Sequence, residues 1–586
     1  MKSRTTWLAL LAAGLAVSAC AGPLDQSPEA ALRESLIEAH RARLQQTTPG
    51  EIVEVERAPS EVERALSPQR REELDELSGP STYEQEPLEL GEDLQGDTDS
   101  PTVRVSLEEA VRLAVQRNLQ AQAARLDPAI AETQIVQALA AFDASFFTTA
   151  DWAKRDTPRP GGAGFGLAGD QQSEILELST GIRQPLTTGG VASIETSVSR
   201  QEQTPTSFAV DRFYRSDVLL TLSQPLLRNF GTAVNRAEIR LAQSARAQQY
   251  ENMVQTLEDI AFTVEQAYWD LVLARYQLHV QTRLLQRTIT DWEQLRERAG
   301  FDVSPVRITE AASFVELRRA DVIRARQNVR TAADQLKRLI NTPELPLTSE
   351  ILVLPTEDPA TAPIEFSLLD AVRTALRHRP ALQRTLLAIR DASIRLDVAD
   401  NQLLPDLNVE AAVGFNGLGI NSAADAYDQL DELNFIDYVL GAEFQYPLGN
   451  RRARARHKQA RLERRQAVIQ YRDAAQEVVL GVKNALRGVV TAYELIGATR
   501  AARRAAADNL RTIQEQEEAG VALTPEFLLD LKLQAQQRVA DAEIQEMEAR
   551  TQYATAIAQL YREMGTLLQR NRIEFGEPIE PTSLDQ

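Results

Sequence analysis

The 586-residue sequence has little of what enzymes, nucleic-acid-binding proteins and helical membrane proteins carry. It has one cysteine, so no internal disulfide can form. Its 64 Lys and Arg residues are outnumbered by 84 Asp and Glu, giving a formal net charge of −20. General nucleic-acid binding is excluded, because it needs a basic surface. Beyond the N-terminus no apolar run reaches the roughly 18 residues of a membrane-spanning helix, so none is expected.

Residues suited to catalysis are equally sparse. No histidine has the spacing of a His-Glu-x-x-His metal site, because the four lie far apart in the sequence: His40, His279, His378 and His457. The glycine-rich stretch 161–166 lies in a Pro-rich loop between strand candidates and does not match a phosphate-binding loop. We therefore expect no enzyme activity, no cofactor, no metal and no nucleic-acid partner.

The N-terminus has the pattern of an export signal. Lys2 and Arg4 precede an apolar run from Trp7 to Val17, and small residues lead to Cys20. This end resembles a bacterial lipobox, which implies cleavage before Cys20 and its lipidation. Ala21 in place of aspartate then implies the outer membrane. The alternative is an ordinary cleavable signal with Cys20 incidental.

A second block of distinct composition follows the signal. Residues 21–100 hold 20 acidic and 7 basic side chains, with prolines scattered through them. Low hydrophobicity with a high net charge is typical of chains that cannot bury a core. The prediction for 20–100 is a lipid-anchored, acidic and largely disordered tether.

Beyond residue 100 the sequence repeats itself. Three landmarks recur in the same order: SLEEAVR at 106–112 and SLLDAVR at 367–373, QPL at 224–226 and YPL at 446–448, AGFDVSP at 299–305 and AGVALTP at 519–525. A conserved order of landmarks indicates an internal duplication, which decides the architecture before any single motif does.

Within each repeat, helical and strand periodicities alternate. Residues 106–141 and 367–404 place apolar residues at three- and four-residue spacing, as a helix does. Strands of about ten residues with one apolar and one polar face fit transmembrane strands. The candidates are 145–155, 174–185, 190–200 and 214–224 in the first repeat, and the region 407–447 in the second.

The predicted helix lengths give a rod. Helices over 229–299 and 450–519 would each rise about 105 Å at 1.5 Å per residue. Each repeat also has a shorter helix before its strands and another after its glycine turn, and the latter ends near Asn341 in the first repeat and near Leu568 in the second. Each of these shorter helices rises roughly 55 Å, so two of them laid end to end match one long helix. A β-sandwich would not leave such helices. One chain has too few strands to close a barrel, and its helices carry apolar stripes that need neighbours. Both features favour ring oligomerisation around a pore.

This ordered set of features resembles the TolC-like outer membrane efflux proteins over about 101–568, and Leu403–Leu407 is similar to the family's helix-to-strand junction. The first repeat departs there, with Ala141-Phe142-Asp143. The resemblance implies a mainly α fold with β. Duplicated helical hairpins would form a periplasmic tunnel, and strands would contribute to a trimeric transmembrane β-barrel. The family contributes four strands per chain, so the extra pair predicted in the first repeat either widens the barrel or forms an extracellular flap.

The resemblance also implies where partners bind. The two helical turns would contact a periplasmic adaptor linked to an inner-membrane pump, with Phe301 and Val521 as apolar knobs; the alternative is that each glycine only caps a helix. The turn residues are Gly300, Phe301, Asp302, Val303, Ser304, Pro305, Gly520, Val521, Ala522, Leu523, Thr524 and Pro525. Family acidic residues that narrow the tunnel correspond to Glu526 and Leu529, with Asp530 one residue beyond; Glu526 alternatively complements the helix dipole.

A basic helix face begins just after the second strand set. Its members share one face by 3-4-3-4 spacing: Arg451, Arg454, Lys458, Arg461 and Arg465. One interpretation is a solvated face that pairs with acidic neighbours. The other is a basic collar lining the lumen.

The predicted function is the outer-membrane channel subunit of a tripartite efflux pump or type I secretion system. The subunit would form a passive homotrimeric duct, and its inner-membrane partner would be a pump of the resistance-nodulation (RND) or ABC type. It would be anchored in outer-membrane lipid with a large periplasmic part. The alternative is a non-conducting coiled-coil lipoprotein that bridges envelope layers. The predicted divisions are signal peptide 1–19, tether 20–100, first repeat 101–341 with strands at 145–224, equatorial linker 342–366, second repeat 367–568 and C-terminal tail 569–586.

Overall fold

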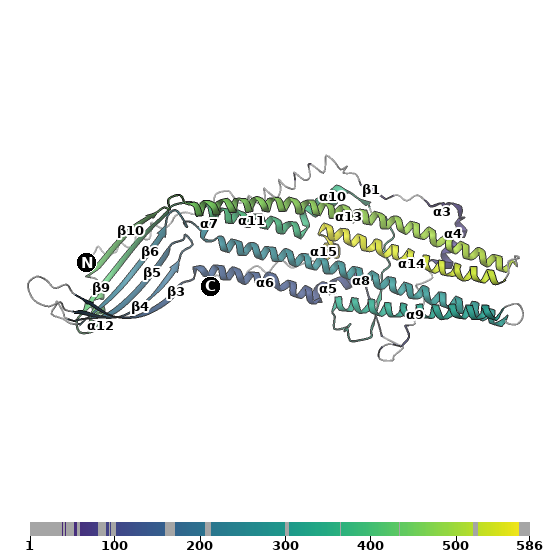
Figure 1. The fold of residues 1–586 in the computed structure, drawn as a ribbon, viewed down its shortest axis with the longest axis horizontal. Helices are drawn as coiled ribbons and strands as arrows, with labels where there is room; N and C mark the ends of the chain where they lie inside the picture. The colour runs from purple at the N-terminus through teal and green to yellow at the C-terminus, as the bar shows by residue number, and fades with distance from the viewer. Residues whose placement is uncertain are drawn as a thin grey trace, which may run out of the picture.

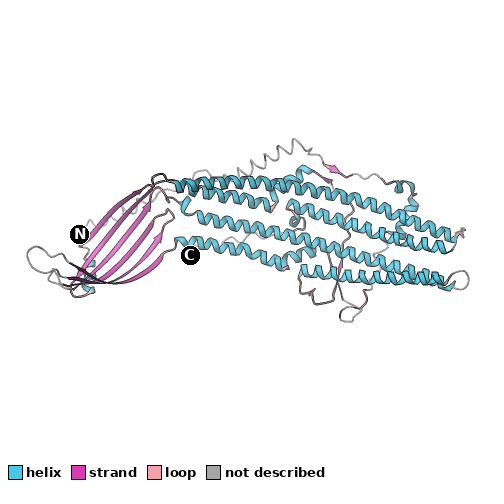
Figure 2. Ribbon diagram, in the orientation of Figure 1, coloured by secondary structure: helices cyan, strands magenta, loops and turns pink. Residues whose placement is uncertain are grey.

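The computed structural model describes residues 101–158, 170–204, 212–298, 304–363, 365–432, 434–519 and 525–573, with short stretches of the first hundred residues. These form an elongated molecule with a β-sheet at one end and long helices running away from it (Figures 1 and 2). None of the described helices has both the length and the hydropathy needed to cross a bilayer. The predicted signal peptide and Cys20 lie outside the described residues.

Two very long helices set the height of the molecule. Helix α8 (Ala237–Glu297) has 61 residues and α13 (Arg451–Glu518) has 68, which corresponds to about 92 and 102 Å. Each is followed by a shorter helix, α9 (Pro305–Ile340) or α14 (Pro525–Met564). Proline suits the first position of both because its missing N–H would have no helical partner there.

The helices predicted over 106–141 and 367–404 are each broken, which corrects the expectation of one helix per segment. The first consists of α5 (Leu107–Arg117) and α6 (Leu119–Leu139), and the second of α10 (Leu368–His378) and α11 (Pro380–Asn401). Asn118 adopts ψ 135° and its side chain accepts from the N–H groups of Gln120 and Ala121, so it starts a new helix. Pro380 forces Arg379 out of the helical region.

Short helices from the two ends of each repeat line up into single columns. Figure 1 shows α6, α5 and α9 following one another along α8, and α11 and α14 along α13. The buried cores lie between these columns. One core is centred on α8, with Leu257, Leu271 and Leu278 fully buried, and the other is centred on α13, with Tyr471 and Val482. The predicted antiparallel columns are present.

The predicted equatorial linker is packed against the middle of the wall. Strand β7 (Leu352–Pro355) pairs in parallel with β2 (Thr102–Val105), and β8 (Glu365–Phe366) pairs with β1 (Val53–Glu54). The hydroxyl of buried Tyr268 on α8 donates to the Val105 carbonyl at 3.3 Å. It also accepts from the backbone N–H groups of Thr356 and Glu357 at 3.0 and 3.1 Å. These bonds fix the linker to α8.

Six long strands form one antiparallel sheet in the order β10-β9-β6-β5-β4-β3. All four strand candidates of the first repeat are confirmed, and each is longer than predicted. The strands are β3 (Ser145–Pro158), β4 (Asp170–Pro185), β5 (Val191–Thr204), β6 (Arg212–Pro225), β9 (Asp406–Gly419) and β10 (Ile436–Gln445). The first repeat therefore contributes four strands and the second contributes two.

The segment predicted as a largely disordered tether contains two short helices, at Glu61–Ala65 and Pro68–Ser78. Helix α3 (Glu61–Ala65) begins at a capping box between Ser60 and Glu63, and α4 (Pro68–Ser78) begins at Ser67 with proline in its first turn. Leu74 of α4 is 1% exposed and packs with Leu510 and Val539. Composition missed this because most of the docking is by charged side chains that find partners far along the chain.

Candidate functional site

The six-stranded sheet has one apolar and one polar face. Strand registers place a continuous apolar row across all six strands: Phe146, Ile182, Ile194, Leu220, Val413 and Tyr438. Except for the half-buried Val413, these side chains are large yet exposed, with Phe146 at 74% and Tyr438 at 76%. A broad exposed apolar surface of this kind marks contact with a membrane or another protein.

The opposite face carries polar side chains that bond to one another across strands. Its row consists of Thr149, Ser179, Ser197, Asp217 and Asn416. The hydroxyls of Thr149 and Ser179 lie 2.6 Å apart, and Ser197 donates to Asp217 at 3.3 Å. This face is therefore suited to water while the other is suited to an apolar environment.

A short helix closes the far end of the sheet. Helix α12 (Ala423–Asp431) connects β9 to β10 and packs on the same face as Val413, beyond the apolar row. A Cβ on Gly417 would lie 2.0 Å from the Ala426 carbonyl oxygen, and one on Gly419 would lie 2.5 Å from that of Ser422. Glycine at both positions is what allows α12 to approach the strand.

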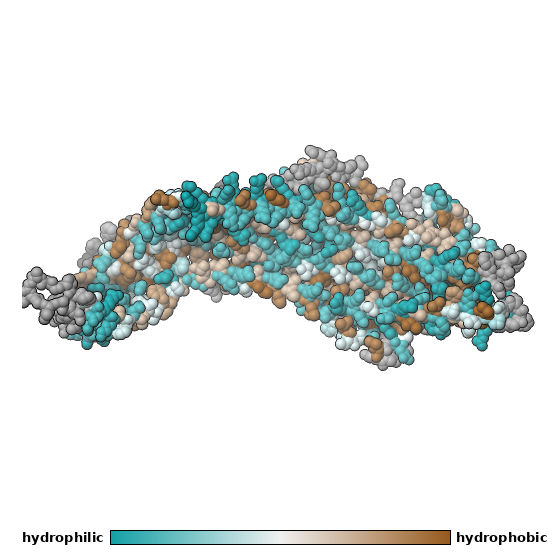
Figure 3. Space-filling model, in the orientation of Figure 1, coloured by the Kyte–Doolittle hydropathy of each residue, from teal (hydrophilic) through white to brown (hydrophobic). Residues whose placement is uncertain are grey.

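The start of α13 presents the predicted basic face. Arg451, Arg454, Lys458, Arg461 and Arg465 are all exposed, and none forms an ion pair with another described residue. Figure 3 shows a strongly hydrophilic surface over the first turns of this helix. By contrast, His457 on the same helix lies 2.7 Å from Asp400. Among the residues that the structure describes, no acidic side chain pairs with this basic face.

The structure describes only the outer parts of the predicted helical turns. Gly300–Val303 and Gly520–Thr524 lie outside the described residues. Ser304 caps α9 by accepting from the Val306 N–H, and Pro305 is its first residue. Pro525 and Glu526 begin α14, and the structure does not describe their side chains. Asp530 accepts from Gln534 one turn along α14, at 3.0 Å. No polar contact joins Asp530 to another helix among the described residues.

A half-buried lysine that the sequence did not reveal joins three helices close to these turns. The Lys532 ammonium on α14 lies 3.0 Å from Asp291 of α8 and 3.1 Å from Glu517 of α13. Gln536 also donates to Asp291, at 2.8 Å. Burial opposes the charge of Lys532, but Asp291 and Glu517 outweigh it and raise the pKa of the ammonium. Lys532 therefore remains charged and holds α14 to both long helices.

The docked α4 helix lies on a second charged network, also missed from sequence. Arg503 of α13 is 2% exposed and donates to Glu546 of α14 at 2.6 Å, to Asp75 of α4 at 2.7 Å and to the Ser78 hydroxyl at 3.1 Å. Burial favours protonation of Glu546, but the neighbouring guanidiniums of Arg503, Arg550 and Arg500 lower its pKa overall. The network connects α4 to both helices of the second repeat.

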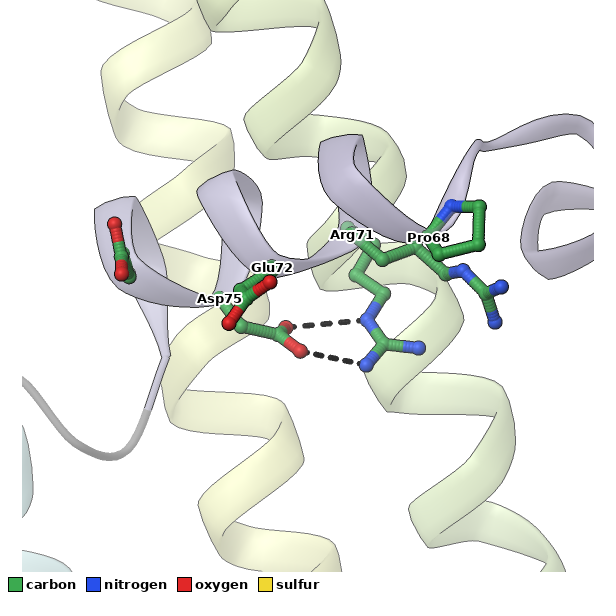
Figure 4. A pocket seen from close by; sticks show the side chains of 6 residues that line it. Pro68, Arg71, Glu72 and Asp75 are labelled. Carbon is green, nitrogen blue, oxygen red and sulfur yellow. Dashed lines mark hydrogen bonds and ion pairs between the residues drawn. The ribbon is translucent and has the colours of Figure 1, made fainter.

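Asp75 also binds a second arginine. Arg504 donates to its two carboxylate oxygens at 3.1 and 2.6 Å, as the paired dashed lines in Figure 4 show. Such bidentate pairs are the strong form of arginine–carboxylate contact. Farther along α4, the Leu77 carbonyl accepts from Arg283 of α8 at 3.1 Å. Helix α4 thus bridges the two repeats.

Near the equator a carboxyl group is buried in α8. Glu258 is 2% exposed, and burial raises its pKa to about 8, opposed by Arg379. Around it, Arg379 pairs with Glu563 at 3.3 Å and Arg562 with Asp259 at 2.7 Å. Glu258 is thus mostly neutral at pH 7. In the part of the chain that the structure describes, no group of three His, Cys, Asp or Glu side chains is arranged to hold a metal ion.

Comparison with known proteins agrees with this geometry. Residues 371–566 match the family model described as outer membrane efflux protein. No curated protein sequence matches the chain significantly. Among solved structures, the CmeC outer membrane channel of Campylobacter jejuni aligns with a TM-score of 0.55 and 16% identity, over 79% of this chain and 86% of that one.

Two further outer-membrane proteins align equally well. The open state of the MtrE outer membrane channel of Neisseria gonorrhoeae gives a TM-score of 0.54 and 18% identity, over 83% of this chain and 97% of that one. The outer membrane protein VceC of Vibrio cholerae gives 0.54 and 15%, over 78% and 96%. At these identities the likeness establishes the fold. Residues 371–566 of the chain are thus similar in sequence to the outer membrane efflux proteins, and the fold as a whole is that of the outer membrane channels named above.

Proposed function

We propose that three copies of this chain form a passive export duct through the outer membrane, as the channel subunit of a tripartite efflux pump or a type I secretion system. The observation that carries the proposal is the two-faced sheet joined to a helical wall about 100 Å tall. The apolar face would meet lipid, the polar face would line the pore, and the columns would extend it through the periplasm.

Partners would supply what this chain lacks. The helical turns at 300–305 and 520–525 would dock a periplasmic adaptor, and an inner-membrane pump of the resistance-nodulation or ABC type would supply energy. The same proposal includes a lipid anchor at Cys20 and no catalytic activity of the chain. Its support is the match of residues 371–566 to the outer membrane efflux protein model, together with the ends of α8 and α13 and the starts of α9 and α14, which lie farthest from the sheet (Figure 1).

Planar-bilayer recording of the purified full-length protein tests the duct. Discrete conductance steps are expected, increasing when the contacts near the helical turns are loosened. A trimer that never conducts, even with Lys532 and Asp291 substituted, would instead favour a structural coiled-coil lipoprotein that bridges envelope layers.

A further inference from the structure

The number of strands per chain has a consequence for the width of the pore. Strand β3 at one edge and β10 at the other are paired on one side only, over 14 and 10 residues. The four strands between them are paired on both sides. Strands alternate in direction across the sheet, and six is an even number, so β3 and β10 run in opposite directions.

The additional hairpin is an integral part of this sheet. Strand β4 pairs with β3 over 14 residues and with β5 over another 14, and β5 pairs with β6 over 12. The apolar row crosses β3, β4 and β5 without interruption. Leu176 and Leu178 on β4 are 48% and 49% exposed, and Trp152 on β3 is 64% exposed. In a flap surrounded by water these apolar side chains would be exposed to solvent, whereas the outer wall of a barrel in lipid is apolar.

The two edges call for a second copy of this chain. An open sheet edge in lipid leaves backbone N–H and C=O groups without partners, each costing several kcal/mol. On β10 the apolar side chains Leu440 and Phe444 are 82% and 65% exposed, and no other described strand pairs with its free edge. Because β3 and β10 are antiparallel, β10 of one copy can continue the ladder onto β3 of the next.

The width of the sheet also matches the helical wall beneath it. Six strands about 4.8 Å apart and tilted by about 40° cover an arc of roughly 38 Å. Two long helices and two composite columns, at about 9.5 Å per column, cover roughly 38 Å as well. Each copy is therefore a sector of nearly constant width from the sheet to the helical turns.

We infer that the duct closes as a barrel of 18 strands, six from each of three copies, with β10 of each copy paired to β3 of its neighbour. This rests on the trimeric duct proposed above. Such a barrel is about 36 Å across between backbones, against about 24 Å for 12 strands of the same tilt. The exit is then as wide as the helical tunnel, and any constriction lies at the helical end or at the rim.

Cysteine cross-linking in the full-length protein, in outer membranes, tests the pairing. Leu440→Cys on β10 is combined with Thr148→Cys, Ala150→Cys or Trp152→Cys on β3, all on the apolar face. Oxidation is expected to give covalent dimers and trimers for at least one pair, because β10 of one copy lies beside β3 of the next copy in the proposed barrel. The control combines Leu440→Cys with Val198→Cys on β5, which its own chain pairs on both sides; no cross-link is expected.

The outcomes separate the two proposals. Cross-linking of β10 to β5 but not to β3 would show that β3 and β4 lie outside the barrel and would overturn the inference while leaving the duct intact. Native mass measurement without a trimer would overturn the proposed function itself. End-on electron-microscopy averages of the unmodified trimer give an independent reading. A ring near 24 Å across, in place of about 36 Å, would also reject 18 strands.

Discussion

Arg503 of α13 and Glu546 of α14 form an ion pair at 2.6 Å whose side chains are only 2% and 3% exposed. Each is bonded further, Arg503 to Asp75 and Ser78, and Glu546 to Arg500 and Arg550. Buried pairs are held in place by such additional bonds, since desolvation cancels much of their attraction. Their importance therefore appears when one partner is removed.

Substituting Glu546→Ala should destabilise the second repeat by about 3–5 kcal/mol, because Arg503 would be left charged and unpaired in a buried position. The measurement is urea or thermal unfolding of the purified protein. Arg511→Ala on α13, the helix that carries Arg503, is the control, since its pair with Glu515 is about half exposed and should contribute less than about 1 kcal/mol. If both variants lowered the free energy of unfolding equally, the special importance of the buried Arg503–Glu546 pair would be contradicted.

Asp75→Asn should release α4 from the wall, because it weakens the bonds to both Arg503 and Arg504. Backbone amides of residues 61–78 are expected to lose protection in hydrogen exchange while those of α8 and α13 keep theirs. Glu76→Gln, at an exposed position one residue along, is the matched control. Unchanged protection in Asp75→Asn would show that Leu74 alone holds the helix.

Lys532→Met should loosen the helical ends. It leaves Asp291 and Glu517 without their shared cation, at a cost of about 1–3 kcal/mol for the buried Asp291 carboxylate. If the duct is constricted at these ends, single-channel conductance should rise. Arg324→Met on α9, an exposed cation that pairs with Asp321, serves as the comparison and should conduct as the unmodified protein does.

Glu258 should make stability fall as pH rises. Its pKa is raised to about 8 in the folded protein from an ordinary value of 4.5, so between these limits the unfolded chain releases a proton that the folded chain retains. The free energy of unfolding should decrease by up to about 1.4 kcal/mol per pH unit in this window. Glu258→Gln should flatten the profile, measured by unfolding at pH 5, 6, 7 and 8. An unaltered slope would show that other groups cause it.

Reversing Arg454, Lys458 and Arg461 to Glu changes the local charge by six per chain, two for each substitution. If this basic face lines the lumen, selectivity in planar bilayers should shift toward cations. Reversal potentials in a salt gradient measure the shift. Arg319→Glu with Arg324→Glu, on exposed α9 positions, changes the charge by four and controls for negative charge added away from this face. Unchanged selectivity would place the face outside the lumen.

Periodicity predicted much of this fold because it depends on neighbours along the chain. The alternation at 174–185 and 214–224 identified strands, since one face meets water and the other does not. Helix lengths identified the columns. The breaks at Asn118 and Arg379 escaped notice, although Pro380 signals the second and the capping ability of asparagine the first.

The charged networks could not be found in the same way. Arg503 and Asp75 are 428 residues apart, and Lys532 and Asp291 also come from different repeats. Nothing local distinguishes these side chains from others in an acidic, arginine-rich chain. For α3 and α4 a signal did exist: Ser60 with Glu63, and then Ser67-Pro68, are helix-start patterns that composition concealed.

The bridge from Asp75 to Arg504 spans 429 residues, so α4 is synthesised long before the helix that receives it. Contacts of such sequence separation form late, because the intervening chain must first be ordered. Both repeats therefore have to be assembled before α4 can dock. Protection of α4 from proteases would thus report the completion of folding. In protomers truncated before α13, α4 would stay sensitive to proteases.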